Sequence, residues 1–147
     1  MKWNWFFIVI ADLVVLGVVI TVLGAQLPRN HVASRTLRLK KSPQEIWPVL
    51  TRLAGASDVP VDVLESDPPR RLVTRVKPSE KMFGGTWSMT IEPDAGGSAV
   101  RIVEDGWVGN PLFRFISRYV IGHHATMDTL LKKVAAELRE DAALSDE

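Results

Sequence analysis

Apolar residues divide the chain into two unequal parts. Within residues 6–23 the only polar side chains are Asp12 and Thr21, whereas apolar and polar positions are interleaved along the rest of the chain. A helix of about 20 apolar residues is long enough to cross a bilayer. A buried helix of a soluble domain would keep one polar face, which this segment lacks. We therefore predict a transmembrane anchor over residues 1–27.

The aspartate does not overturn this prediction. A central aspartate costs about 2.5–3.5 kcal/mol on insertion, but the fourteen Leu, Ile, Val and Phe residues of the run favour insertion by about 4–8 kcal/mol in total. The alternative is a cleaved signal peptide, whose apolar region is about 7–15 residues long and ends in a small-x-small cleavage site. The best candidate site here ends at Ala25 and has the bulky Leu23 two positions earlier, so we expect an uncleaved anchor.

Basic residues are concentrated after the apolar run. Only Lys2 precedes it, and the positive-inside rule therefore places the C-terminal part of a single-pass membrane protein in the cytoplasm. The basic residues just after the run are Arg29, Arg35, Arg38, Lys40 and Lys41.

A single α+β domain is predicted over residues 32–140. The tether to the anchor, residues 28–31, is so short that the domain must lie on the membrane, because an extended residue spans only about 3.3–3.6 Å. Period-2 alternation of apolar positions, with Asp-Ala-Gly-Gly as a hairpin turn at 94–97, predicts antiparallel strands. Their ranges are 32–39, 61–65, 71–76, 85–92 and 98–108.

A first helix is predicted from the pattern Ser-Pro-Gln-Glu. Ser42 is a suitable N-cap, Pro43 suits the first helical position, and Glu45 completes a capping box. The apolar residues that follow give this helix one buried face: Ile46, Trp47, Val49, Leu50 and Leu53.

A second helix is predicted from Asn110 and Pro111 to about residue 139, as one long amphipathic helix. Apolar residues recur every three or four positions along it, so one stripe is expected to be buried. The acidic tail, residues 141–147, is expected to fray. The stripe contains Phe113, Ile116, Val120, His123, Met127, Leu130 and Val134.

Three segments, together with the order of the elements, resemble the START-like superfamily, the SRPBCC group that includes polyketide cyclase/dehydrase-type proteins. They are residues 39–47, where a strand runs into a Ser-Pro helix start, residues 83–93 and residues 104–115. The resemblance covers about residues 31–140. It implies a helix-grip fold, in which an antiparallel sheet wraps around a long C-terminal helix and encloses a cavity for an apolar ligand. The strands here are few and short, and the anchor is an addition to the family pattern.

His123 and Glu104 are the candidates for chemistry. His123 lies on the apolar stripe that faces the cavity in a helix-grip fold, where it could orient a ligand or move a proton. Glu104 continues the alternation of Val100 and Ile102 and could be a general acid or base, paired with His123 or Arg75. The alternative is a structural role: a core histidine satisfied by a strand, and a half-exposed carboxylate.

Large apolar side chains are numerous for so small a domain, and we expect them to line the cavity together with the two polar candidates. Most of them could equally serve as core. The expected lining residues are Trp47, Phe83, Trp87, Met89, Glu104, Trp107, Phe113, Ile116, Val120, His123 and Met127.

Several classes of function receive no support. With 18 basic and 17 acidic residues the net charge is +1, which provides no electrostatic basis for binding nucleic acid. The absence of cysteine excludes disulfides, thiolate metal sites and cysteine nucleophiles. His124 and Asp128 have the i, i+4 spacing of metal ligands but lack a third ligand nearby, and there is no phosphate-binding loop or nucleophile motif. We expect no metal and no cofactor.

The sequence therefore favours a membrane-tethered protein that binds a hydrophobic small molecule or lipid without catalysis. The second hypothesis is an enzyme of cyclase or dehydratase type that uses His123 and Glu104. The third is a structural or assembly factor whose core is completely filled. The sequence does not indicate the oligomeric state.

Overall fold

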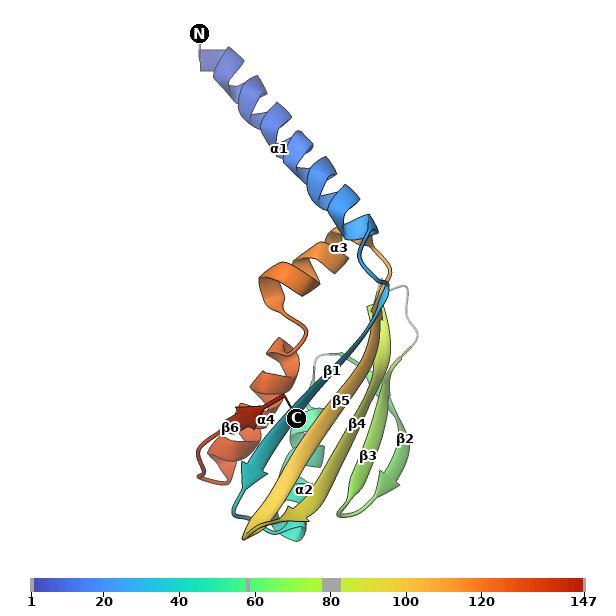
Figure 1. The fold of residues 1–147 in the computed structure, drawn as a ribbon, viewed down its shortest axis with the longest axis vertical. Coiled ribbons are helices and arrows are strands. Elements are labelled where there is room, and N and C mark those ends of the chain that lie inside the picture. The colour runs from blue at the N-terminus through green and yellow to red at the C-terminus, as the bar shows by residue number, and fades with distance from the viewer. Residues whose placement is uncertain (1, 58, 78–82, 147) are drawn as a thin grey trace.

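The centre of the fold is a six-stranded antiparallel sheet (Figure 1). The computed structural model describes residues 2–57, 59–77 and 83–146. Along the sheet the strand order is β2-β3-β4-β5-β1-β6. The strands are β1 (Asn30–Leu39), β2 (Val61–Asp67), β3 (Arg71–Val76), β4 (Phe83–Asp94), β5 (Gly97–Val108) and β6 (Ala143–Ser145).

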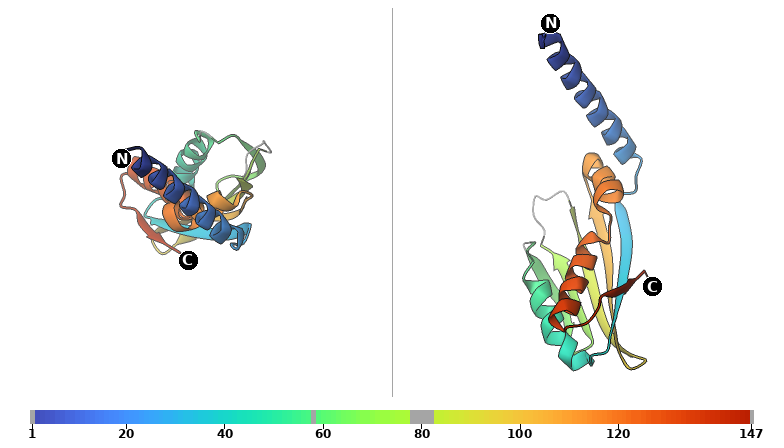
Figure 2. Two further views of the ribbon diagram at one scale, coloured as in Figure 1. Left: turned by 90° about the horizontal axis from the view of Figure 1, so that it is seen from above. Right: turned by 90° about the vertical axis from the view of Figure 1, so that its left-hand side faces the viewer.

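Two helices, α2 (Pro43–Gly55) and α4 (Ala125–Glu137), cover one face of this sheet (Figure 2). The expected capping box of α2 is present, since Glu45 N–H donates to Ser42 Oγ and the Glu45 carboxylate accepts from Ser42 N–H. The alternation expected for β4 is confirmed, because Met89 and Ile91 are buried. The core between the layers includes Leu37, Ile46, Leu50, Met89, Ile91, Val100, Ile102, Met127, Leu131 and Val134.

The first helix, α1 (Lys2–Ala25), extends away from the domain (Figure 1). It is long and apolar enough to cross a membrane, and its apolar span is not buried against the domain. Only its last turn is packed. Gly24 is buried there against α3 (Pro111–Ile116), and a Cβ at this position would overlap the carbonyl oxygen of Pro111.

The C-terminal helix differs from expectation, because it is not one continuous helix. It consists of α3 (Pro111–Ile116), the short π-helical segment η1 (Ser117–Ile121) and then α4. Asn110 is the N-cap of α3, as expected. Gly122 separates η1 from α4 with φ +81°, a conformation that suits glycine and commonly ends a helix.

The acidic tail is also more ordered than expected. β6 pairs with the β1 segment Thr36–Arg38, and the side chain of Arg35 forms an ion pair with Asp146. The sheet therefore includes residues beyond 140. In addition, β1 begins at Asn30, so half of the expected tether already belongs to a strand.

The packing at Gly24 predicts a difference between two glycine variants. Gly24→Ala should lower the free energy of unfolding by on the order of 1–3 kcal/mol, because the new methyl group overlaps Pro111. The melting temperature of the detergent-solubilised protein should fall accordingly. Gly17→Ala is the matched control in the same helix, since nothing lies within 4 Å of its Cβ position. Equal melting temperatures for the two variants would contradict the close packing of α1 on α3.

Candidate functional site

A cavity of about 500 Å³ lies at the end of the sheet nearest α1. Its walls come from the start of β1, the start of β4 and the end of β5, which the antiparallel pairing places side by side. The segment from α3 to Thr126 closes the opposite side. The lining residues are His31, Phe83, Gly84, Glu104, Trp107, Val108, Phe113, Ile116, Ser117, Ile121, Gly122, His123 and Thr126.

Two glycines make room for the side chains on the strand surface. A Cβ on Gly106 would lie 2.8 Å from the imidazole Cε1 of His31 and 3.0 Å from a carboxylate oxygen of Glu104. A Cβ on Gly84 would lie 2.8 Å from the indole nitrogen of Trp107. Any larger residue at either position would displace the side chains that line the cavity, so glycine is required for this arrangement.

A polar cluster lies on one side of the cavity. His31 Nε2 is 3.4 Å from Glu104 Oε1, and these side chains are only 16% and 21% exposed. The rings of His31 and His123 are stacked, with their centroids 4.0 Å apart and their planes inclined by 18°. The hydroxyl of Ser117 is 3.4 Å from His123 Nδ1. The three elements β1, β5 and η1 thus contribute to one connected group of polar side chains.

The surroundings of His123 disfavour its protonation. Burial lowers the pKa of His123 below its ordinary value, and the Coulombic influence of His31, Arg118 and His124 lowers it further. The ring is therefore neutral at pH 7. A neutral imidazole offers one donor and one acceptor, so it can hydrogen bond to an uncharged polar group of a ligand.

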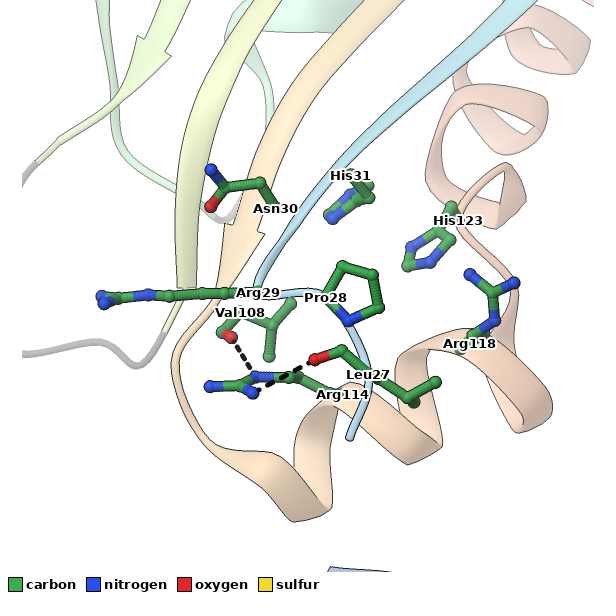
Figure 3. Close-up of a pocket in the computed structure, with 9 residues that line it drawn as sticks. All are labelled: Leu27, Pro28, Arg29, Asn30, His31, Val108, Arg114, Arg118 and His123. Carbon is green, nitrogen blue, oxygen red and sulfur yellow. Dashed lines mark hydrogen bonds between the residues drawn. The ribbon is translucent and has the colours of Figure 1, made fainter. Parts of the chain in front are cut away.

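A second, much smaller space of about 30 Å³ adjoins the two histidines on the side of the tether (Figure 3). Arg114 lines it, and its guanidinium donates to the carbonyl oxygens of Leu27, Val108 and Gly109. These bonds join the end of the anchor, the end of β5 and α3. A volume of this size suits a single water molecule, so the larger cavity is the candidate site.

The structure distributes the eleven expected lining residues over four environments. Met89 and Met127 are buried in the core, Trp47 and Trp87 pack against the core, and Val120 is exposed on the surface. These five do not line the cavity. The break at Gly122 explains two of them, because it takes Val120 and Met127 out of register with His123. The remaining six do line it: Phe83, Glu104, Trp107, Phe113, Ile116 and His123.

The partner of Glu104 was not anticipated. Glu104 continues the inward row of Val100 and Ile102, as expected, but it pairs with His31. The signal was present in the sequence, because His31 lies two positions before Ala33 on the buried side of the first strand. It was hidden by the assignment of residues 28–31 to the tether.

His124 and Asp128, which have the spacing of metal ligands, do not form a metal site together with a third residue of the described chain. Asp128 accepts a hydrogen bond of 2.6 Å from Arg35 and therefore serves an ion pair between α4 and β1. Within the part of the chain that the structure describes, no group of three His, Cys, Asp or Glu residues could hold a metal ion.

The comparisons with known proteins support the fold. No known family model matches this chain, and no curated protein matches it in sequence. Among solved structures, protein MLL2253 from Mesorhizobium loti matches with a TM-score of 0.56 and 16% identity, over 77% of this chain and 99% of that chain. A conserved protein from Geobacillus kaustophilus matches with a TM-score of 0.53 and 12% identity, over 78% and 99%. At such identities the likeness concerns the fold alone.

The fold is a helix-grip fold. The expectation of an antiparallel sheet around a C-terminal helix is confirmed at this level, with α4 as the gripped helix. The division of that helix at Gly122 leaves the end of the sheet near α1 free for the cavity.

The lowered pKa of His123 predicts a pH dependence of stability. Below about pH 6.5 this histidine is protonated in the unfolded chain, whereas in the folded chain it binds the proton more weakly. The unfolded state is thereby favoured, so the melting temperature should fall between pH 7.5 and pH 5.5. The melting temperature of His123→Gln should fall less over this pH range than that of the wild type, as measured by thermal unfolding at each pH.

His124→Gln is the matched control, because it removes the neighbouring histidine and retains His123, the group whose pKa is lowered. Its melting temperature should fall nearly as much as that of the wild type between pH 7.5 and pH 5.5. If the melting temperature of His123→Gln fell as much as that of the wild type, His123 would not be the group responsible.

Proposed function

We propose that this protein is a START-like domain held at a membrane by α1, which binds a hydrophobic small molecule or lipid in the cavity beneath α3. The observation that carries this proposal is the cavity itself. Its volume of about 500 Å³ lies within the range of about 300–1,000 Å³ that is typical of ligand pockets.

The lining of the cavity supports an amphiphilic ligand. The apolar wall consists mainly of Phe83, Trp107, Phe113 and Ile116, while the polar group around His123 occupies one side. Apolar walls contribute affinity, and a few polar groups orient a ligand. The neutral ring of His123 fits an uncharged hydroxyl or carbonyl group on an otherwise apolar molecule.

The anchor supports a ligand that reaches the domain from the membrane. The cavity is at the same end of the sheet as α1, and Arg114 ties the end of the anchor to the cavity-lining segment. The excess of basic residues after the anchor favours a cytoplasmic location for the domain.

Native mass spectrometry of the protein released from detergent micelles tests the binding proposal. Wild-type protein should carry an additional mass of an apolar ligand. Ile116→Trp should carry much less of it, because the indole occupies the cavity that Ile116 lines. The matched control is Val63→Trp, a substitution at a 61% exposed position on β2 outside the cavity. Failure to find a ligand on the wild type, or equal retention by Ile116→Trp, would contradict the proposal.

Catalysis is the second candidate, and the pairing of His31 with Glu104 is the observation that favours it. A carboxylate beside an imidazole orients the ring and stabilises its protonated form, as in general-base catalysis. In a dehydratase of this kind, the pair would take a proton from a carbon of the bound ligand and pass it to the hydroxyl group on the neighbouring carbon, which leaves as water while a C=C bond forms.

The Glu104→Gln variant distinguishes the two candidates. If the protein is a binding protein, the ligand recovered from the variant should have the same mass as that from the wild type. A dehydratase would instead accumulate its substrate in the variant, which would be heavier than the product by one water molecule. Mass spectrometry of the extracted ligands makes this comparison.

A further inference from the structure

Three consecutive apolar side chains at the end of η1 are exposed. Tyr119, Val120 and Ile121 keep 63%, 71% and 62% of their surface accessible. Scattered exposed apolar residues are ordinary, but a contiguous group marks a contact with a protein or a membrane. These residues face outward because the helix that carries them ends at Gly122 and does not continue onto the sheet.

The exposed group is continuous with the surface of α1. A Cβ on Gly24 would lie 3.4 Å from the Cβ of Phe115, so the end of α1 contacts this phenylalanine. The ring of Phe115 in turn lies 4.9 Å from the ring of Tyr119. An apolar path thus leads from the anchor through Phe115 to the end of η1. In Figure 1 the segment α3–η1 runs crosswise from the end of α1 and does not continue its direction.

The charges around this path fit an anionic surface. No acidic residue occurs between Asp105 and Asp128, a stretch that contains Arg114 and Arg118. Arg118 is exposed, and its guanidinium lies 5.9 Å from the centre of the Tyr119 ring. Tyrosine and arginine beside apolar residues are typical of the membrane interface, where anionic headgroups attract basic side chains.

We propose that α3–η1 is a second membrane contact, in which Tyr119, Val120 and Ile121 enter the interfacial layer of the bilayer that holds α1. Arg118 lies at the level of the lipid phosphates. The partner is a bilayer containing anionic lipids, and the proposal rests on the anchoring role of α1. Ile121 also lines the cavity, so this contact places the cavity wall at the membrane surface.

The chain has no cysteine, so single-cysteine variants can carry one environment-sensitive fluorophore each. The full-length protein is placed in nanodiscs of phosphatidylcholine and phosphatidylglycerol, with and without nitroxide-labelled lipid as a quencher. The probe is attached to Val120→Cys. Ala95→Cys is the control, because it is exposed in the β4–β5 turn, at the end of the sheet opposite α1. Val14→Cys reports the anchor itself.

The expected result is strong quenching at positions 14 and 120 and little at position 95. Quenching at 120 no greater than at 95, with position 14 quenched, would overturn the second contact and leave the anchor intact. A blue-shifted but unquenched probe at 120 would show that protein covers this surface, which would equally overturn the proposal. Absence of quenching at 14 would instead reject the anchoring on which the proposal rests.

The role of Arg118 gives an independent measurement. In the Val120→Cys background, Arg118→Gln should reduce quenching in nanodiscs with phosphatidylglycerol and have little effect in pure phosphatidylcholine. The loss should also diminish at high salt, because surface charges are screened. An equal effect of the substitution in both lipids would contradict the assignment of Arg118 to anionic headgroups.

Discussion

The interruption at Gly122 is the constraint on which the rest of this structure depends. A residue with φ +81° cannot continue a right-handed helix, so the chain turns before α4 begins. The second piece, α4, packs on the sheet and fills the core with Met127, Leu131 and Val134. The first piece, α3–η1, stays at the end of the sheet and forms one wall of the cavity. One continuous helix could not place its halves in these two environments.

The same interruption assembles the polar cluster. His123 follows the glycine directly and its ring stacks on His31, which the first strand contributes from far away in the sequence. Polar groups removed from water are costly unless they find partners, and here His31 has Glu104 and His123 has Ser117. The burial that creates the cavity also keeps His123 neutral. Cavity shape and protonation state are therefore set by one arrangement of the backbone.

The junction between α1 and the domain is fixed by packing as well as by its short length. Gly24 allows the last turn of α1 to touch the start of α3, and Arg114 donates to the carbonyl oxygens of Leu27, just after α1, and of Val108 at the end of β5. The position of α1 is therefore tied directly to that of α3, which lines the cavity. This contact would give a physical reason for the proposed combination of apolar-ligand binding and membrane attachment in one small chain.

Features that depend on neighbouring residues were determined by the sequence alone. The apolar helix, the capping box of α2, the N-cap of α3, the alternation of β4 and the inward direction of Glu104 all follow from local pattern or backbone chemistry. Gly122 also carried a signal, because glycine is unfavourable inside a helix by about 1 kcal/mol. The regular apolar spacing from Phe113 to Val134 nevertheless predicts one continuous helix. Periodicity alone does not show that the helix breaks, or how the residues after the break are oriented.

Only the tertiary structure decided which residues meet. The pairing of His31 with Glu104, the placement of Met89 and Met127 in the filled core and not in the cavity wall, and the addition of β6 to the edge of β1 depend on strand register and on the break at Gly122. None of these contacts is encoded within one helical turn or one strand period. They join segments up to about a hundred residues apart, and their free energy comes from burying both segments together, a quantity that no local pattern contains.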